Sequence, residues 1–174
     1  MFDLKATIGV EDTRDKIIFW DIDGTLAPYR YNGHVADPEG TSNGQSMEEI
    51  EQGIFFERKP SRFMQSVLRE SQAREHIVMG HCICEKEVSD KQKWLDVHYP
   101  FIKKRLFAHE SKSKAETILN YCRENAIDLQ DVLFVDDRLA ILKEAERKGI
   151  QVWHISSFLD WYIDRLPLDD KQSL

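Results

Sequence analysis

Two carboxylates directly follow an apolar run near the start of the chain and could do chemistry together. The run covers residues 17–20, and Asp21 and Asp23 come next, with Gly24 behind them. Neighbouring carboxylates both stay ionised only where a cation lies between them; otherwise one keeps a proton. A carboxylate can be a covalent nucleophile in phosphoryl transfer, and its oxygens suit Mg²⁺. For this pair alone, an acidic surface turn is the competing interpretation.

A second pair of acids lies more than a hundred residues further along the chain. Asp136 and Asp137 end the apolar run 132–135, and Lys114 stands between the two pairs at the start of a helical pattern. Ligands of open α/β sheets bind at the carboxyl ends of the strands, where the strand order reverses. Because both runs end on acids, we expect the two strands to be neighbours and their acids to meet at one edge of the sheet.

Asp-x-Asp-Gly-Thr, then a lysine, then an apolar run ending in Asp-Asp is an ordered set of motifs. It resembles the haloacid dehalogenase-like superfamily of hydrolases, of the small-cap type, from about residue 16 to residue 161. The segments 93–95 and 133–158 look like the phosphatase domain of phage-type polynucleotide kinases, a 3'-phosphatase, and like small deoxyribonucleotidases. The resemblance implies a phosphatase that acts on a phosphorylated small molecule or nucleotide, or on a nucleic-acid end.

The chemistry of these side chains, in agreement with the resemblance, assigns a role to each. Asp21 is the expected nucleophile, which forms an aspartyl-phosphate, and Asp23 is the general acid and then the base that activates water. The carboxylates of Asp21 and Asp136 and the carbonyl of Asp23 are the expected Mg²⁺ ligands. Asp137 is expected to support that geometry. Lys114 neutralises the acids and holds a phosphoryl oxygen; as an alternative, it is an ordinary solvated helix residue.

Two positions leave alternatives open. Lys112 is a rival for the lysine role, and Lys114 is preferred because the family commonly has Lys-Ala-Glu at this helix start. The family also ends its second strand on a serine or threonine that binds the phosphate, whereas Gly80 stands here, with His81 next. A backbone N–H or His81 could replace the hydroxyl. Losing one hydrogen bond to a charged group costs about 1.5–3 kcal/mol, so a slow or specialised enzyme is expected.

His81, Cys82 and Cys84 also invite a zinc interpretation. Zinc sites usually have two cysteine or histidine pairs at wider spacing, and no second pair is evident, so the sequence disfavours zinc. The three cysteines, Cys122 included, are an odd number without framework spacing, which indicates free thiols and a cytoplasmic location.

Strand-like and helix-like patterns alternate along the chain. We expect a three-layer α/β/α sandwich with a Rossmann-like, doubly wound, five-stranded parallel sheet, formed by one domain over residues 1–174. Ser89 with Gln92 predicts the start of the helix that carries Trp94 and Leu95. The strands are expected at 17–20, 76–79, 105–107, 132–135 and 151–155.

One segment, 29–59, is long, polar and rich in glycine. A loop this long inside a domain is usually functional or disordered, so we expect either a small lid over the site or a surface excursion. Ser46 with Glu49 predicts a short helix through Ile50.

Composition excludes several classes of protein. The 174 residues are 41% hydrophobic and 32% charged, which is typical of globular proteins, and no apolar run is long enough to cross a membrane. The net charge of −7 argues against a sequence-independent DNA-coating protein. The leading hypothesis is a Mg²⁺-dependent phosphomonoester hydrolase; the alternative is a catalytically attenuated metal-binding protein that engages a partner through the lid. Short basic clusters occur at Arg58, Lys59 and Arg62 and at Lys103, Lys104 and Arg105.

Overall fold

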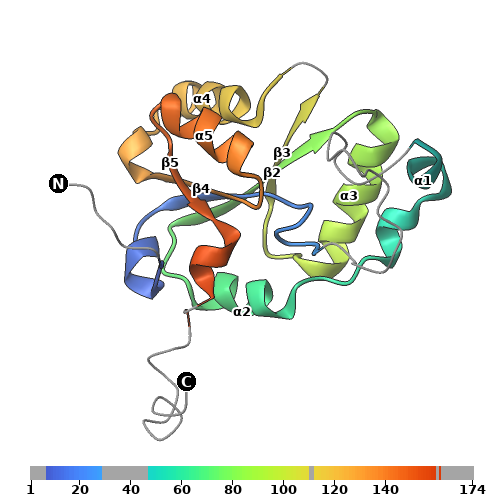
Figure 1. Ribbon diagram of the computed structural model, residues 1–174, viewed down its shortest axis with the longest axis horizontal. Coiled ribbons are helices and arrows are strands. Elements are labelled where there is room, and N and C mark those ends of the chain that lie inside the picture. The colour runs from blue at the N-terminus through green and yellow to red at the C-terminus, as the bar shows by residue number, and fades with distance from the viewer. Residues whose placement is uncertain (1–6, 29–46, 110–111, 160, 162–174) are drawn as a thin grey trace, which may run out of the picture.

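The computed structural model describes residues 7–28, 47–109, 112–159 and 161. They form a five-stranded parallel sheet in the order β3-β2-β1-β4-β5. Helices cover both faces, as Figure 1 shows. The strands are β1 (Ile17–Trp20), β2 (Glu75–Cys82), β3 (Lys104–His109), β4 (Val132–Asp136) and β5 (Gln151–His154). The α/β class and the parallel sheet predicted from the sequence are therefore confirmed, with β1 between β2 and β4.

The five α-helices in the described part of the chain divide between the two faces and one end of the sheet. They are α1 (Met47–Gln52), α2 (Arg62–Glu70), α3 (Glu85–His98), α4 (Lys114–Glu124) and α5 (Leu139–Arg147). Short 3-10 turns lie at Val10–Thr13, Ile54–Glu57, Leu129–Asp131 and Ile155–Phe158. In Figure 1, α4 and α5 lie together over one side of the sheet, and α1 lies beyond α3.

Alternate side chains of the strands divide the apolar core into two layers. Ile18 and Trp20 of β1 pack in the layer that contains buried residues of α2 and α3. Ile17 and Phe19 pack in the other layer, against α4 and α5. Because neighbouring strand residues point to opposite faces, a continuous apolar run such as β1 requires cover on both faces. A residue that follows a strand continues this alternation, so its position determines whether it faces α2 and α3 or α4 and α5.

Candidate active site

The turn after β1, residues 21–27, carries two of the predicted site residues, Asp21 and Asp23. The Ala27 N–H donates a hydrogen bond to the Ile22 carbonyl at 2.8 Å, which closes the turn. Gly24 has a φ of 86°, in the left-handed region that glycine enters without steric cost. The Tyr99 hydroxyl donates to a backbone carbonyl of the same turn at 3.0 Å. The fold therefore holds both carboxylates on a short, well-braced loop.

Lys114 lies between the acids that follow β1 and end β4. Its ammonium group donates to Asp21 Oδ1 and, at 2.8 Å, to Asp136 Oδ2, and all three residues are buried. Ser113 caps α4 by accepting a hydrogen bond from the Glu116 N–H at 3.1 Å, so the lysine occupies the first helical position. The structure thus brings together acids that are far apart in the sequence.

Burial controls the ionisation of this group. Desolvation raises the pKa of Asp21 well above its usual range, and the neighbouring acids add to this, although Lys114 opposes the rise. Burial alone would lower the pKa of Lys114, but its contacts with Asp21 and Asp136 outweigh burial and raise it. The lysine stays positively charged, yet one ammonium faces an excess of carboxylates. A further cation would relieve that excess.

Asp137 completes a group of acids that could hold a metal ion. Carboxylate oxygens of Asp21, Asp136 and Asp137 all lie within 4.8 Å of one another. Within the described residues, Asp137 Oδ1 is buried and has no hydrogen-bond partner. Burial, followed by the charge of Asp136, raises the pKa of Asp137 to about 6. An orphaned carboxylate oxygen beside two others fits a hard cation such as Mg²⁺. The supporting role expected for Asp137 stays a prediction. The Asp137 carboxylate lies close enough to Asp21 and Asp136 that it could itself bind an ion held by those two acids.

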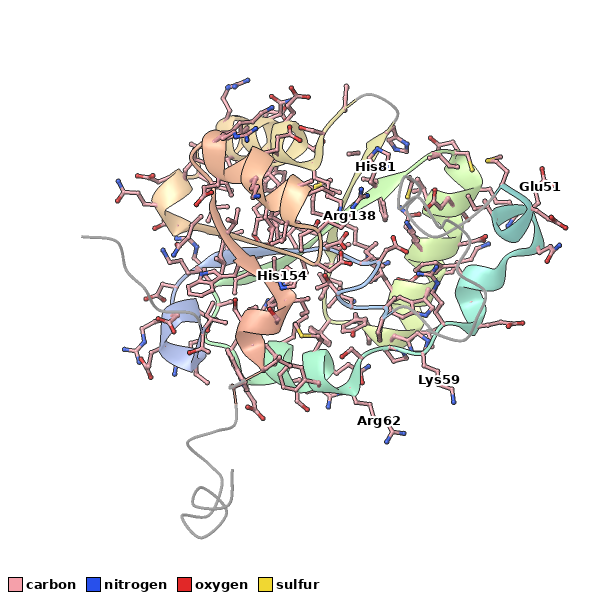
Figure 2. The ribbon with its side chains drawn as sticks, in the orientation of Figure 1. Glu51, Lys59, Arg62, His81, Arg138 and His154 are labelled. Atoms are coloured by element: carbon pink, nitrogen blue, oxygen red, sulfur yellow. The ribbon has the colours of Figure 1, made fainter. Side chains whose placement is uncertain are left out.

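His154, at the end of β5, is a residue that sequence reasoning missed. Its Nε2 lies 2.9 Å from the Asp137 carbonyl oxygen. Its Nδ1 accepts from the Ser156 N–H at 3.2 Å, so Nε2 is the nitrogen that donates. The Arg138 N–H donates to Asp136 Oδ1 at 2.8 Å. Figure 2 labels His154 and Arg138 near the centre of the molecule. His154 therefore holds the backbone at Asp137, and the Arg138 N–H holds the carboxylate of Asp136.

Asp23 lies in a separate group of charges. Arg58 Nη1 is 2.9 Å from Asp23 Oδ1, and Lys91 Nζ is 2.6 Å from Asp23 Oδ2. Lys91 also pairs with Glu87 at 2.6 Å and donates to the His81 carbonyl at 3.1 Å. Both carboxylate oxygens of Asp23 thus accept from cations. Sequence reasoning missed Lys91 and Glu87 and assigned Arg58 only to a basic cluster.

Gly80 and His81 point to opposite faces of β2. A Cβ atom on Gly80 would lie 2.9 Å from Phe107 Cδ1 and 3.0 Å from Ile22 Cδ1, so this side is filled by apolar groups. His81 alternates with Gly80 and faces the layer of Met79, which packs against α4. Figure 2 shows His81 labelled at the β2 end. His81 rather than Gly80 therefore shares a face with Lys114.

The rival lysine, Lys112, lies elsewhere. Its exposed side chain lines a surface groove between β3 and α4, together with His109 and Tyr121. The acids are contacted by Lys114. The role assigned to Lys114 stays a prediction.

The thiols near β2 are poor candidates for zinc ligands. Burial raises the pKa of Cys82 to about 12, which disfavours the thiolate that a metal needs. Cys84 lies next to it in the chain and ends the connection to α3. Within the described residues, the one group of possible metal ligands is the acidic one.

Most of the predicted lid lies outside the described residues, which resume at Met47. The helix expected through Ile50 is present as α1, Met47–Gln52. After it, the buried Phe55 packs edge-on against Trp94 of α3 with ring centroids 5.5 Å apart. Arg58 follows and reaches Asp23, so the end of this segment touches the site. No helix in the described part of the chain is long and apolar enough to span a bilayer.

Comparison with solved structures shows the fold. A haloacid dehalogenase-like hydrolase from Streptococcus pneumoniae has a TM-score of 0.53 at 13% identity, over 83% of this chain and 90% of that chain. The HAD domain of the effector protein Lem4 from Legionella pneumophila, as an inactive mutant, has a TM-score of 0.47 at 12% identity, over 92% and 99% of the two chains. No protein-family model matches the sequence, and no curated protein is significantly similar. The chain has the haloacid dehalogenase-like fold.

A third structure covers a larger protein. The N-terminal part of a Bacteroides fragilis protein, described as containing a phosphatase domain and complexed with Mg, has a TM-score of 0.45 at 16% identity. The match covers 83% of this chain and 36% of that chain.

Proposed function

We propose that the protein is a Mg²⁺-dependent phosphomonoester hydrolase that works through an aspartyl-phosphate. The observation that carries the proposal is the acidic group around Lys114 at the carboxyl edge of a parallel sheet, formed by the buried Asp21 and Asp136 and the half-buried Asp137. A buried carboxylate beside an ammonium group and an excess of negative charge suits a metal-assisted nucleophile.

Each side chain has a task in this reaction. Asp21 forms the bond to phosphorus as the bond to the leaving oxygen breaks, and Asp23 donates the proton that the leaving oxygen takes up. Asp23, now ionised, then accepts a proton from the water that attacks phosphorus; the bond between phosphorus and Asp21 breaks, and phosphate leaves. Lys114 holds a phosphoryl oxygen and limits repulsion between the acids. The carboxylates of Asp21, Asp136 and Asp137 and the Asp23 carbonyl would hold Mg²⁺, which supplies charge neutralisation at the phosphate.

The proposed substrate is a phosphorylated small molecule or nucleotide, with a nucleic-acid end as the extended case. Several basic side chains that could bind nucleic acid are paired within the protein. Arg58 pairs with Asp23, Lys104 with Glu75 at 2.9 Å, and Arg105 Nη1 with the Asp96 carboxylate at 2.7 Å. Of the other cations in the two basic clusters, Lys59, Arg62 and Lys103 are exposed and offer a small basic surface; Figure 2 labels Lys59 and Arg62. This pairing favours the nucleotide over a long nucleic acid.

A cytoplasmic location also belongs to the proposal. The three cysteines are free thiols, which suits a reducing compartment.

The test is a phosphoester panel with and without Mg²⁺, read as phosphate release. Wild type should release phosphate only with Mg²⁺, and intact-protein mass should show one phosphoryl group on a rapidly quenched sample. Asp21→Asn should lose both signals while its circular dichroism stays unchanged. Activity that persists in Asp21→Asn, or in excess EDTA, would contradict the proposal.

A second candidate is an attenuated metal-binding protein that engages a partner through the lid. It is favoured by the apolar filling at Gly80, where Phe107 and Ile22 occupy the side on which the family hydroxyl is expected. A protein that binds Mg²⁺ by calorimetry yet releases no phosphate from the whole panel would support it.

A further inference from the structure

Lys91 is a buried charge that the proposed reaction does not yet use. Its side chain is 1% exposed, although it lies in the middle of α3 rather than at a helix end. A lysine that deep costs several kcal/mol in desolvation unless it is fully paired. Its ammonium group has three partners: Asp23 at 2.6 Å, Glu87 at 2.6 Å and the His81 carbonyl at 3.1 Å. These three use all three of its N–H donors.

The three contacts join three parts of the site. Asp23 lies on the turn after β1, His81 at the end of β2, and Glu87 on the same helix as Lys91, one turn earlier. Glu87 also accepts from the Ile83 N–H at 2.8 Å, which fixes the loop between β2 and α3. Lys91 therefore sets the distance between the proposed acid and the strand end that carries His81.

The same helix contains an ion pair that makes a useful contrast. Lys86 pairs with Asp90 at 2.6 Å on the same helix, but its side chain is 46% exposed. Its partner Asp90 is only 12% exposed, so the pair is half-buried and the lysine lies on its solvent side. Lys91, five residues further along α3, is instead buried. Burial against Asp23 is the feature that separates the two lysines.

We propose that Lys91 is a positioning residue that holds Asp23 in the orientation in which its protonated carboxyl group gives a proton to the leaving group. The inference deepens the proposed function and rests on it. A proton donor must lie within hydrogen-bond reach of the leaving oxygen, and misplacement by about 1 Å can cost on the order of 100-fold in rate. Lys91 fixes Oδ2 from α3, whereas Arg58 reaches Oδ1 from the segment that precedes α2.

The experiment compares two substrates in four variants. The substrates are p-nitrophenyl phosphate, whose leaving group needs no proton, and an alkyl phosphate, whose leaving group does. The variants are Lys91→Met, Asp23→Asn, their double mutant, and Lys86→Met as the matched control. Lys91→Met keeps the apolar stem and removes the charge.

Lys91→Met should lower kcat on the alkyl phosphate by about 10- to 100-fold, a part of the roughly 10²- to 10⁴-fold that general acid catalysis supplies. On p-nitrophenyl phosphate the loss should stay below about 3-fold, and KM should change little on either substrate. In the Asp23→Asn background, Lys91→Met should add almost nothing, because coupled residues are non-additive. Lys86→Met should behave as wild type.

Removal of Lys91 leaves Glu87 as an unpaired buried acid, so the single mutant can lose stability for that reason alone. The pair Lys91→Met with Glu87→Gln removes both charges, and the amide oxygen can still accept from the Ile83 N–H. This double mutant should show the same difference between the two substrates as Lys91→Met.

Equal losses on both substrates, or full additivity with Asp23→Asn, would overturn the positioning role while leaving the phosphatase intact. If wild type releases no phosphate from the whole phosphoester panel with Mg²⁺, the two substrates included, the proposed function fails and the inference fails with it. The two failures are therefore distinguishable.

Discussion

Two lysines serve two acids that are two residues apart, and they come from opposite faces of the sheet. Lys114 on α4 contacts Asp21 and Asp136, and Asp137 lies beside them; we name these four residues the Lys114 cluster. The Lys91 cluster comprises Asp23, Lys91, Glu87 and Arg58. Three carboxylates face one ammonium in the first cluster, whereas two carboxylates face two cations in the second. The first can take up a cation, and the second is already balanced.

The difference in charge assigns different tasks to the two acids. A cluster with excess negative charge gains from Mg²⁺ and can bring the phosphate close to Asp21 despite its charge. A balanced cluster gains nothing from an ion but fixes the direction of a carboxylate. The comparison therefore predicts that nucleophile and metal belong to the Lys114 cluster, and that orientation of the acid belongs to the Lys91 cluster.

The largest expected effect comes from Asp21→Asn. The amide keeps the size of the side chain but removes the nucleophile, so kcat should fall at least about 10³-fold on every phosphoester. In Asp23→Asn, kcat should fall by a similar factor only on substrates with poor leaving groups. Stopped-flow phosphate release measures both. If the two variants lose activity in parallel on all leaving groups, the clusters do not divide the work as proposed.

The sequence indicated that Asp21, Lys114 and Asp136 lie together, partly from local signals and partly from the family resemblance that preferred Lys114 to Lys112. Two apolar runs end on acids, and Ser113 with Glu116 forms the capping box that places Lys114 at the first position of α4. Strand alternation then brings Asp21 to the α4 face.

The Lys91 cluster could not be predicted, because no local pattern marks it. Its partners are 68 and 35 residues apart in the pairs Lys91–Asp23 and Arg58–Asp23. The capping box expected at Ser89 was also wrong: the N-cap of α3 is Cys84, five residues earlier, and the helix begins at Glu85. Glu87, whose carboxylate accepts from the Ile83 N–H, braces this earlier start. Because the predicted start of this helix was wrong by more than one turn, the sequence did not show which lysine of the helix faces the sheet.

His76 sets a pH-dependent baseline for any stability comparison of the clusters. Burial lowers the pKa of His76 from 6.5 to about 4. Its Nδ1 lies 3.0 Å from Trp20 Nε1, from which it accepts. As pH falls from 6.5 towards 4, His76 therefore becomes protonated in the unfolded chain but stays neutral in the folded protein. The contribution of neutral His76 to the free energy of unfolding is fully present above pH 6.5. Up to roughly 3 kcal/mol of it is lost as the pH falls from 6.5 to 4.

Urea unfolding of His76→Gln between pH 4 and 7 checks this. The variant should lose stability less steeply than wild type over that window, and His109→Gln, on the edge strand, serves as the control. Equal pH slopes in wild type and His76→Gln would show that the loss arises elsewhere.

Mg²⁺ should stabilise the protein through the Lys114 cluster alone. A ligand that binds only the folded state adds about 2.7 kcal/mol at a hundredfold excess over its Kd. Asp136→Asn should remove most of the Mg²⁺-dependent rise in Tm. Asp23→Asn should retain it, because the backbone carbonyl survives and the carboxylate of Asp23 already faces cations. Differential scanning calorimetry with and without Mg²⁺ decides; a full response in Asp136→Asn would contradict the ligand assignment.

The smallest expected effect concerns Gly80, on the face of β2 that belongs to the Lys91 side. Its φ is not positive, so the backbone accepts a side chain, but a Cβ atom would lie 2.9 Å from Phe107 Cδ1. Gly80→Ser alone should therefore cost about 1–3 kcal/mol from overpacking, and Phe107→Leu in the same chain should recover much of it. The new hydroxyl would point towards Ile22 and away from the Lys114 cluster.

We therefore expect the Gly80→Ser, Phe107→Leu double mutant to change kcat/KM by less than about 3-fold, whereas His81→Ala should lower it about 10-fold. His81 lies on the face of Lys114, where the phosphate would bind, and one lost hydrogen bond to a charged group costs about 1.5–3 kcal/mol. Steady-state kinetics at saturating Mg²⁺, with urea unfolding to confirm folding, measures both. A rise of ten-fold or more in the Gly80 double mutant would place the phosphate on the Lys91 side. The charge comparison between the clusters would then no longer predict where the phosphate binds.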